Sequence, residues 1–197
     1  TAIYQTADIA FDTAGSIGRA GCACEIRITG PNGADLPEGE VGEIWVRGAN
    51  ILTRYWRDEA ATAASITDGW FHTGDMARID GDGFYWFADR LKHVIISGGE
   101  NIYPAELERV LRDLPGLSEF AIVGRDDERW GQVPVVVAVA GGTPSSESVD
   151  RAAVLAHFQG KLARFKHPKD VLFVEELPRN ALGKIVAADV RALLTGD

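Results

Sequence analysis

The pattern of apolar residues changes close to residue 91, and this change constrains the fold more than any other feature of the chain. Before it, short extended segments alternate with glycine-rich turns, which is typical of β structure. The clearest strand runs from Gly42 to Gly48, and residues 77–88 are predicted to form a hairpin closed by Asp80-Gly81-Asp82-Gly83. One short helix is predicted over residues 58–64. We therefore predict a β-rich unit for residues 1–91.

After residue 91, predicted strands and helices alternate. Pro104 suits the first turn of a helix, and apolar residues follow it at the spacing of one helix face: Leu107, Val110, Leu111 and Leu114. Further strands are predicted at residues 94–96, 120–123, 133–139 and 171–174. Further helices are predicted from Ser148, as the cap, to about Leu162 and from Ala187 to Leu194, with a loop over residues 141–146. Residues 92–197 are thus expected to form a compact α+β unit, which places the whole chain in the α+β class.

Composition favours a globular protein and excludes several other classes. The chain has 197 residues, 46% of them hydrophobic, which is enough for one or two packed domains. No apolar run approaches the roughly 18 residues of a membrane span, and no signal peptide is recognisable, so a cytoplasmic location is expected. The net charge of -9 argues against nucleic-acid binding. Because the sequence begins at Thr1 within predicted β structure, we expect a fragment of a longer protein of undetermined oligomeric state.

The two cysteines do not suggest a disulfide or a metal site. Cys22 and Cys24 lie two residues apart in a predicted strand, where their side chains would point the same way along that strand. No histidine or second cysteine pair stands at the spacing of metal ligands. We therefore expect no metal bound by this chain.

One segment reverses the acidic balance of the chain. Residues 161–184 hold six basic side chains against three acidic ones. Such a run is either a solvated face or a surface for a phosphate-bearing small molecule. It ends in Asn180-Ala181-Leu182-Gly183-Lys184, which is predicted to be a short flexible loop. Lys184 is either an ordinary turn lysine or a cation that reaches an anionic reaction centre. The loop is not a phosphate-binding loop, because Pro178 stands where the upstream glycine would be.

Charged residues in two earlier segments have the chemistry of nucleotide contacts. Asp75 ends the run Asp-Gly-Trp-Phe-His-Thr-Gly-Asp, and a carboxylate at a strand edge can accept two hydrogen bonds from a ribose diol. Arg90 offers planar donors for phosphate or sugar oxygens, and Lys92 offers a point charge. Taken singly, these residues favour a simple turn at Asp75 and a surface ion pair between Asp89 and Arg90.

A third group combines glycines with aromatic residues. In Ser97-Gly98-Gly99-Glu100, the paired glycines permit a ligand to approach the backbone closely, although they also suit a strand-to-helix turn. Trp130 and Phe165 lie beside basic residues. An aromatic ring in that setting either stacks on a purine or belongs to the core. His167 and Lys169 follow Phe165 closely.

Taken together and in this order, the motifs resemble those of the adenylate-forming superfamily, which includes acyl- and aryl-CoA synthetases, nonribosomal adenylation domains and luciferases. The resemblance runs from Gly15-Ser16-Ile17-Gly18-Arg19 to the last predicted helix, and the segments around Ser97, Trp130 and Phe165 are most similar to the acyl-CoA synthetase branch. It implies two steps: a carboxylic acid and ATP give an acyl-adenylate and pyrophosphate, and coenzyme A then displaces AMP. It also implies that residues 1–91 end a large AMP-binding domain, which a small mobile domain follows.

The resemblance implies a role for each residue named above. Asp75 matches the position that binds the ribose hydroxyls, Arg90 a neighbouring nucleotide contact, and Lys92 both a nucleotide contact and the hinge. Lys184 matches the catalytic lysine that bridges the carboxylate and the α-phosphate in the first step. The implied coenzyme A contacts are Ser97, Gly98, Gly99, Glu100, Trp130, Phe165, His167 and Lys169. Rotation about the hinge would replace the lysine loop with the glycine turn.

Some features depart from the family pattern. His167 stands where an arginine is often found, and Arg54 where a glycine is usual. The family's ATP phosphate loop, its Tyr-Gly-x-Thr-Glu motif and its acid pocket have no counterpart here. We therefore expect Mg²⁺ to be bound largely outside this chain, the fragment alone to be inactive, and the acid, fatty or aromatic, to be undefined by this sequence. A domain that loads a carrier protein and a non-catalytic module that binds nucleotide or coenzyme A are the alternatives.

Overall fold

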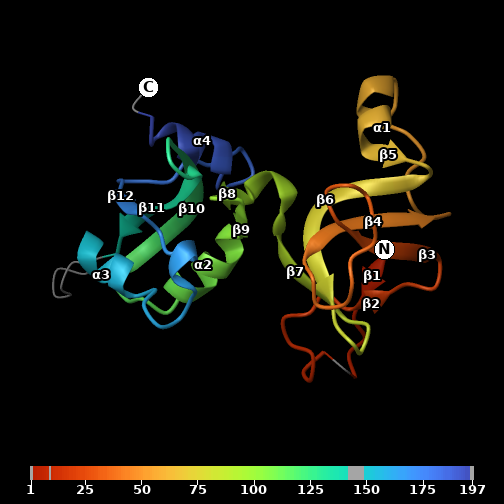
Figure 1. Ribbon diagram of the computed structural model, residues 1–197, viewed down its shortest axis with the longest axis horizontal. Helices are drawn as coiled ribbons and strands as arrows, with labels where there is room; N and C mark the ends of the chain where they lie inside the picture. Colours follow the sequence, from red (N-terminus) through yellow and green to blue (C-terminus); the bar gives the residue numbers. More distant parts are fainter. Residues whose placement is uncertain (1, 9, 142–148, 196–197) are drawn as a thin grey trace. The chain divides into compact units, whose positions relative to one another are not determined.

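The computed structural model describes residues 2–8, 10–141 and 149–195 (Figure 1). The chain divides between Lys92 and His93 into two compact units. We name them unit 1 (Thr1–Lys92) and unit 2 (His93–Asp197). Both units contain strands and helices, which confirms the α+β prediction. Within the described residues, no helix is long and apolar enough to cross a bilayer.

Unit 1 is built on a five-stranded antiparallel sheet. Four strands follow the order β3-β4-β6-β5, and β7 also pairs with β6. Their bounds are β3 Cys24–Thr29, β4 Gly42–Gly48, β5 Ile66–Thr67, β6 Trp70–Ile79 and β7 Tyr85–Arg90. A separate antiparallel pair consists of β1 (Ile3–Tyr4) and β2 (Arg19–Ala20). The sheet buries a cluster of apolar side chains: Ile28, Ile44, Val46, Ala77 and Tyr85.

The helix predicted in the first unit is present as α1, Glu59–Ser65. Asp58 caps it, because its side chain accepts the N–H of Ala61 at 2.8 Å. None of the residues of α1 is buried, and the helix stands next to β5 at one end of the sheet (Figure 1). One prediction was wrong: Cys22 lies in a turn before β3, because the N–H of Cys24 closes that turn on a backbone carbonyl at 3.3 Å. Both cysteines are free thiols.

Unit 2 is built around the long hairpin of β10 (Leu117–Asp127) and β11 (Gly131–Ala140). Antiparallel β8 (Ile95–Ser97) and parallel β12 (Asp170–Phe173) pair with β11 along the edge that β10 leaves free. Beyond β8, β9 (Glu100–Ile102) ends the sheet. The strands predicted at residues 120–123 and 133–139 are the apolar centres of β10 and β11. Both strands are longer than predicted, because polar and charged residues near the hairpin turn continue the backbone pairing beyond the apolar core.

Alternate residues of the hairpin are buried on opposite faces of the sheet. On one face, Ile122 and Val136 pack with the apolar residues of α2 (Pro104–Leu111) and α3 (Arg151–Ala156). On the other face, Val123 and Val137 pack against Val190 of α4 (Ala187–Ala192). Unit 2 is therefore a sheet with helices on both faces (Figure 1).

The helices of unit 2 are shorter than predicted. α2 ends before Leu114 and α4 before Leu194, although both leucines still pack against the core. The cap of α3 is Asp150, whose carboxylate accepts a backbone N–H at 2.7 Å. The predicted cap, Ser148, and most of the predicted loop over 141–146 lie outside the described residues. The predicted extension of α3 to about residue 162 was wrong. The chain leaves the helix after residue 156 and turns through Gly160, which has a φ of +72°.

Candidate functional site

Two of the predicted nucleotide contacts, Asp75 and Arg90, lie on adjacent strands of unit 1. Asp75 on β6 is the register partner of Arg90, the last residue of β7. Their side chains form an ion pair and are 34% and 48% exposed, respectively. Asp89 is buried, and its carboxylate accepts the backbone N–H of Arg90 at 2.7 Å. The guanidinium of Arg90 therefore reaches across the sheet to Asp75, and Asp89 is not the surface residue that the sequence allowed.

Lys92 lies in a short 3₁₀ helix, Leu91–His93, at the division between the two units. Its side chain is exposed. A short 3₁₀ segment between two separately packed cores can change its torsions without disturbing either core, which suits a hinge. The nucleotide contact predicted for Lys92 stays a prediction.

The glycine turn joins two strands, not a strand and a helix as the sequence also allowed. Ser97 of β8 pairs with Glu100 of β9, so Gly98 and Gly99 are the two turn residues, with φ values of +62° and +87°. Positive φ at both turn positions is the type I′ pattern, which favours glycine. The N–H of Gly98 donates to the carbonyl of Trp130 at 2.8 Å, and a Cβ at Gly98 would lie 2.8 Å from the indole ring. The structure thus brings Ser97–Glu100 and Trp130 together.

Trp130 is a surface residue that the β10–β11 turn holds in place. Its side chain is 43% exposed, so it is not part of the core. The carboxylate of Asp127 accepts the backbone N–H groups of Arg129 and Trp130 at 3.0 and 2.9 Å. The guanidinium of Arg129 lies 4.7 Å from the centre of the indole ring. A fixed aromatic face with a cation beside it is suited to a purine carrying phosphate.

The basic segment contains side chains that face solvent and side chains tied to the fold. Phe165 is 44% exposed, and Lys169 is also exposed. Lys166, in the 3₁₀ turn Arg164–Lys166, donates to both carboxylate oxygens of Glu106 on α2, at 2.8 and 2.7 Å. The Nε2 atom of His167 lies 3.0 Å from a backbone carbonyl oxygen. That ring can therefore offer a ligand only its other nitrogen.

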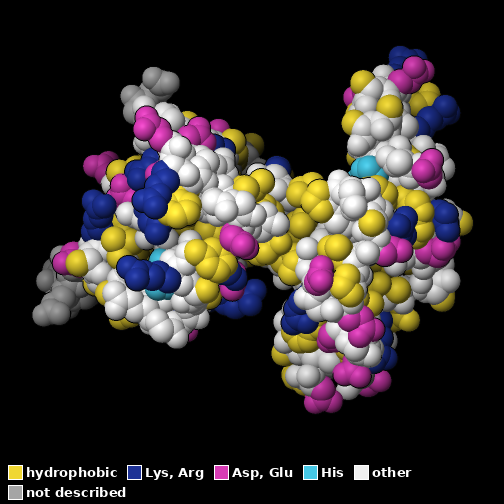
Figure 2. Space-filling model, in the orientation of Figure 1, with side chains coloured by type: hydrophobic (Ala, Val, Ile, Leu, Met, Phe, Trp, Pro, Cys, Tyr) yellow, Lys and Arg dark blue, Asp and Glu magenta, His cyan; other side chains and the backbone are white. Residues whose placement is uncertain are grey.

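An anionic residue follows directly after Lys169. Burial opposes ionisation of Asp170, but hydrogen bonds from Arg125 at 2.8 Å and from a backbone N–H, together with the charge of Arg151, hold the pKa of Asp170 below its usual value. The carboxylate of Asp170 thus forms ion pairs with two arginines. Figure 2 shows basic and acidic side chains intermixed over β12 and α3. The surface is therefore not uniformly positive, and an anionic ligand would depend on specific side chains.

Lys184 stands at the end of a loop whose backbone is fixed by one side chain. The Oδ1 atom of Asn180 accepts the N–H groups of Leu182 and Lys184, both at 3.0 Å. Gly183, with a φ of +77°, donates its N–H to the carbonyl of Asn180 at 2.9 Å. The loop is thus more ordered than predicted. The ammonium group is exposed and makes no hydrogen bond or ion pair to any of the described residues.

Arg179 attaches the lysine loop to the sheet. Its Nη1 atom donates to the carbonyl of Gly183 at 2.6 Å, and its Nη2 atom pairs with Glu119 near the start of β10. A backbone bridge between Arg179 and Ile185 closes the base of the loop. The loop is therefore anchored at the open end of the β10–β11 hairpin.

The register of this hairpin separates the lysine loop from the glycine turn. Glu119, which anchors the loop of Lys184, lies near the start of β10, whereas Asp127 ends that strand at the hairpin turn. Gly131, the register partner of Asp127, also pairs with Ser97. Glu119 and Asp127 are eight residues apart along the strand, about 26 Å at roughly 3.3 Å per residue. The two predicted functional loops thus lie at opposite ends of one hairpin.

The residues that hold these loops in place were not predicted from the sequence. Asn180 had a usable signal, since an asparagine two and four residues before the N–H groups that it accepts is an Asx-type turn pattern. Asp127 gives a similar local signal. The ion pairs of Arg179 with Glu119 and of Lys166 with Glu106 each span 60 residues and have no local signal.

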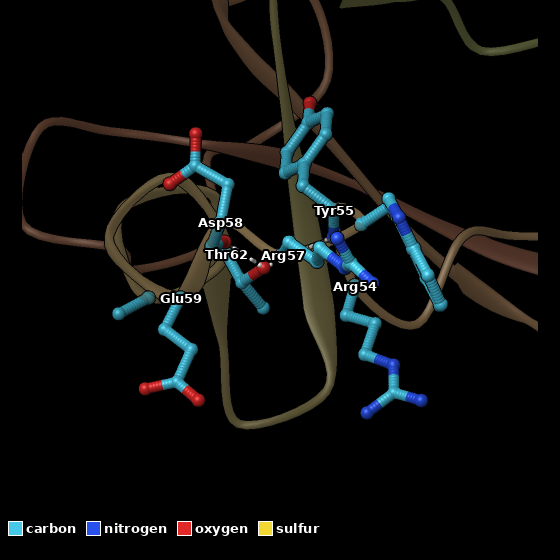
Figure 3. A pocket seen from close by; sticks show the side chains of 8 residues that line it. Arg54, Tyr55, Arg57, Asp58, Glu59 and Thr62 are labelled. Carbon is cyan, nitrogen blue, oxygen red and sulfur yellow. Dashed lines mark hydrogen bonds between the residues drawn. The ribbon is translucent and has the colours of Figure 1, made fainter.

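A pocket of about 370 Å³ lies outside these residues, next to α1 (Figure 3). Its lining comprises residues 54–59, 62 and 63. Figure 3 shows the carboxylates of Asp58 and Glu59 on the opposite side from the guanidinium of Arg54. None of the residues predicted to bind nucleotide or coenzyme A lines this pocket.

Comparison with known proteins agrees with this geometry. The family described as "AMP-binding enzyme C-terminal domain" matches residues 106–184, and the family "AMP-binding enzyme" matches residues 1–56. The indoleacetate–CoA ligase of Aromatoleum aromaticum is 51% identical over 181 residues, which are 92% of this chain and 35% of that protein. The feruloyl-CoA synthase of an Amycolatopsis species is 46% identical over 178 residues, 90% of this chain and 35% of that protein.

A solved structure gives the same result. The o-succinylbenzoate CoA synthetase of Bacillus subtilis, in complex with its acyl-adenylate intermediate, superposes with a TM-score of 0.86 at 34% identity. The match covers 97% of this chain and 38% of that one. The chain thus spans little more than a third of the length of the relatives that it matches, and it belongs to the adenylate-forming, AMP-binding enzymes.

Proposed function

We propose that this chain is the C-terminal part of an ATP-dependent acyl- or aryl-CoA synthetase. Such an enzyme joins a carboxylic acid to ATP, with release of pyrophosphate, and then transfers the acyl group from the adenylate to coenzyme A. The observation that carries the proposal is the placement of the Lys184 loop and the Gly98–Gly99 turn at opposite ends of one hairpin. Two surfaces placed in this way can serve the two steps of such a reaction, each presented to the same centre in turn.

In the first step, Lys184 would bridge the carboxylate and the α-phosphate of ATP. Two anions must approach each other there, and a positioned ammonium group offsets their repulsion as charge redistributes in the transition state. The exposed ammonium of Lys184 on an ordered loop supports this role. Asp75 would accept hydrogen bonds from the ribose hydroxyls, with Arg90 beside it as a donor for the nucleotide.

In the second step, the glycine turn would line the path of the pantetheine chain. Gly98 and Gly99 have no side chains to obstruct a thin ligand, and Ser97 and Glu100 flank them. Trp130 would stack on the adenine of coenzyme A. Phe165 would also contact the nucleotide of coenzyme A through its ring, and the basic side chains of His167 and Lys169 would contact the phosphates. Lys92 would act as the hinge on which unit 2 changes orientation between the steps.

Among residues 2–8, 10–141 and 149–195, no group of three His, Cys, Asp or Glu side chains could hold a metal ion. Structures of the Bacillus subtilis relative contain ATP with a magnesium ion, or AMP. We therefore propose that ATP and AMP bind partly through this chain, whereas Mg²⁺ binds outside it. ATP and coenzyme A are intracellular substrates, which favours a cytoplasmic location.

The test is Lys184→Ala in the complete enzyme, with the two half-reactions measured separately. Acid-dependent release of pyrophosphate should fall about 10²- to 10³-fold, the usual effect of removing a donor that stabilises a developing charge. Conversion of preformed acyl-adenylate to thioester should be nearly unchanged. Lys161→Ala, an exposed lysine of the same basic segment outside the loop, should leave both rates unchanged.

Two outcomes would contradict the proposal. An equal loss of both half-reactions in Lys184→Ala would refute the specific role of the lysine. Transfer of the acyl group to a phosphopantetheinyl carrier protein but not to free coenzyme A would assign the chain to the carrier-loading enzymes instead.

A further inference from the structure

The pairing of β4 with β6 is interrupted beside Asp75. Glu43 pairs with Met76, but the next pair along the ladder is Trp45 with His72. One residue of β4 therefore faces three residues of β6, Thr73–Asp75. Such a bulge leaves backbone groups without their ladder partners. Something other than the regular ladder must fix the conformation of this segment.

Two side chains supply the missing partners. One carboxylate oxygen of Glu43 accepts the N–H of Gly74 at 2.9 Å. The hydroxyl of Thr73 donates to the carbonyl of Ile44 at 2.8 Å and accepts the N–H of Asp75 at 3.1 Å. The bulge is thus joined to β4 through Gly74 and Thr73, the two residues that directly precede Asp75.

Glu43 is itself held in a defined orientation. Its second carboxylate oxygen accepts the indole N–H of Trp45 at 2.9 Å. The indole in turn stacks on the ring of His72, with ring centres 3.9 Å apart and planes 13° from parallel. His72 is the residue directly before the bulge. Contacts from Glu43 therefore reach the bulged segment twice, directly at Gly74 and through the Trp45 indole at His72. Because the acceptor is a carboxylate, these hydrogen bonds are stronger than those between neutral groups.

We propose that Glu43 is a positioning residue that acts on the nucleotide through Asp75. The carboxylate fixes the bulge, and the bulge presents Asp75 at the edge of the sheet, opposite Arg90. The role rests on the proposed function, in which Asp75 binds the ribose hydroxyls. Glu43 would act without touching the nucleotide, because its two carboxylate oxygens bind Gly74 and Trp45, and its removal should loosen Asp75 without unpairing the rest of the sheet.

The experiment compares two nucleotides in the complete enzyme. The KM of the adenylation step is measured for ATP and for 2′,3′-dideoxy-ATP, which lacks the hydroxyls that Asp75 would bind. Asp75→Asn sets the scale, because it should remove the preference for ATP. Glu43→Ala should raise the KM for ATP about tenfold and leave that for the dideoxy nucleotide nearly unchanged.

A second pair of variants separates positioning from folding. In Glu43→Gln, the amide oxygen can accept one N–H, but the amide NH₂ then faces the other donor. Replacing that donor, in Glu43→Gln with Trp45→Phe, should recover part of the preference for ATP that Glu43→Gln alone loses. Glu25→Ala is the matched control, since Glu25 lies on the same sheet and bonds Arg47 at 2.7 Å, away from the bulge.

The outcomes are distinct. An equal rise in KM for both nucleotides in Glu43→Ala, or no recovery in the double variant, overturns the positioning role of Glu43. Retained discrimination in Asp75→Asn overturns the ribose contact itself, and the role of Glu43 with it. Loss of discrimination in both Asp75→Asn and Glu43→Ala, with recovery in the double variant, supports the proposal.

Discussion

The two ends of the β10–β11 hairpin carry loops that differ in construction. At the open end, the loop of Lys184 is fixed by side chains: Asn180 closes it, and Arg179 ties it to the sheet. At the closed end, the turn of Gly98 and Gly99 is fixed by backbone torsions and by contact with Trp130. One end carries a flexible charged side chain on an ordered backbone, and the other carries bare backbone beside an aromatic ring. The difference fits the two roles proposed above, delivery of a charge by Lys184 and passage of the pantetheine chain along the glycine turn.

The largest effect is expected from a variant that hinders the proposed rotation of unit 2, so that the two ends of the hairpin cannot replace each other at the reaction centre. Lys92→Pro fixes φ near −65°, which lies within the range of the 3₁₀ conformation at this position. The variant should therefore restrict the change of torsion on which the proposed rotation of unit 2 before the second step depends. We expect thioester formation from preformed acyl-adenylate to fall roughly a hundredfold, about 3 kcal/mol, with a much smaller effect on adenylation.

Lys92→Ala is the control for this variant, because it removes the charge and leaves φ free. It should retain thioester formation. Unchanged kinetics of both half-reactions in Lys92→Pro would remove the hinge assignment.

The closed end can be tested alone with Gly98→Ala. A non-glycine residue at a φ of +62° costs about 1–2 kcal/mol, and the new Cβ would meet the Trp130 ring at 2.8 Å. We expect thioester formation to fall about ten- to thirtyfold and adenylation to be spared. Rates of the two half-reactions check this.

A matched variant isolates the contact with the indole ring. Gly99→Ala has a similar torsional cost, but its Cβ would meet no atom within 4 Å. It should therefore be less damaging than Gly98→Ala. Equal losses in the two variants would show that Trp130 does not restrict the turn.

The smallest expected effect is at the open end. Asn180→Ala removes the acceptor of two backbone N–H groups, worth about 1 kcal/mol, and should slow adenylation about fivefold without affecting thioester formation. The loss should disappear in a Lys184→Ala background, because the loop then has no charge to position. A loss that persists in that background would mean that Asn180 acts on the fold and not through the lysine.

Features that depend on residues close together in the sequence could be predicted, whereas features that depend on contacts between distant segments could not. The strand from Gly42 to Gly48, the helix after Pro104 and the hairpin of residues 77–88 follow from spacing and turn residues close in the chain, and the structure confirms them. Helix ends were less predictable. Leu114 keeps the apolar spacing of α2 but packs on the core from outside the helix.

Within the candidate site, the sequence identified the charged and glycine residues but not their supports. Glu43 and Thr73 act through a bulge, and no local pattern shows which strand lies opposite a bulge. The alternative that Trp130 and Phe165 belong to the core could be resolved only by their exposure, which depends on how the unit packs. The pairing of Arg90 with Asp75 likewise depends on strand register.

The continuous pairing of the β10–β11 hairpin has a consequence for timing. Backbone pairing is uninterrupted from Glu119 with Val139 to Asp127 with Gly131, so the two ends of the hairpin are held apart at a fixed distance. In the proposed enzyme, only one end can occupy the reaction centre at any moment, and the two half-reactions are mutually exclusive. A compound that pins unit 2 in either orientation would stop turnover while one half-reaction stayed measurable.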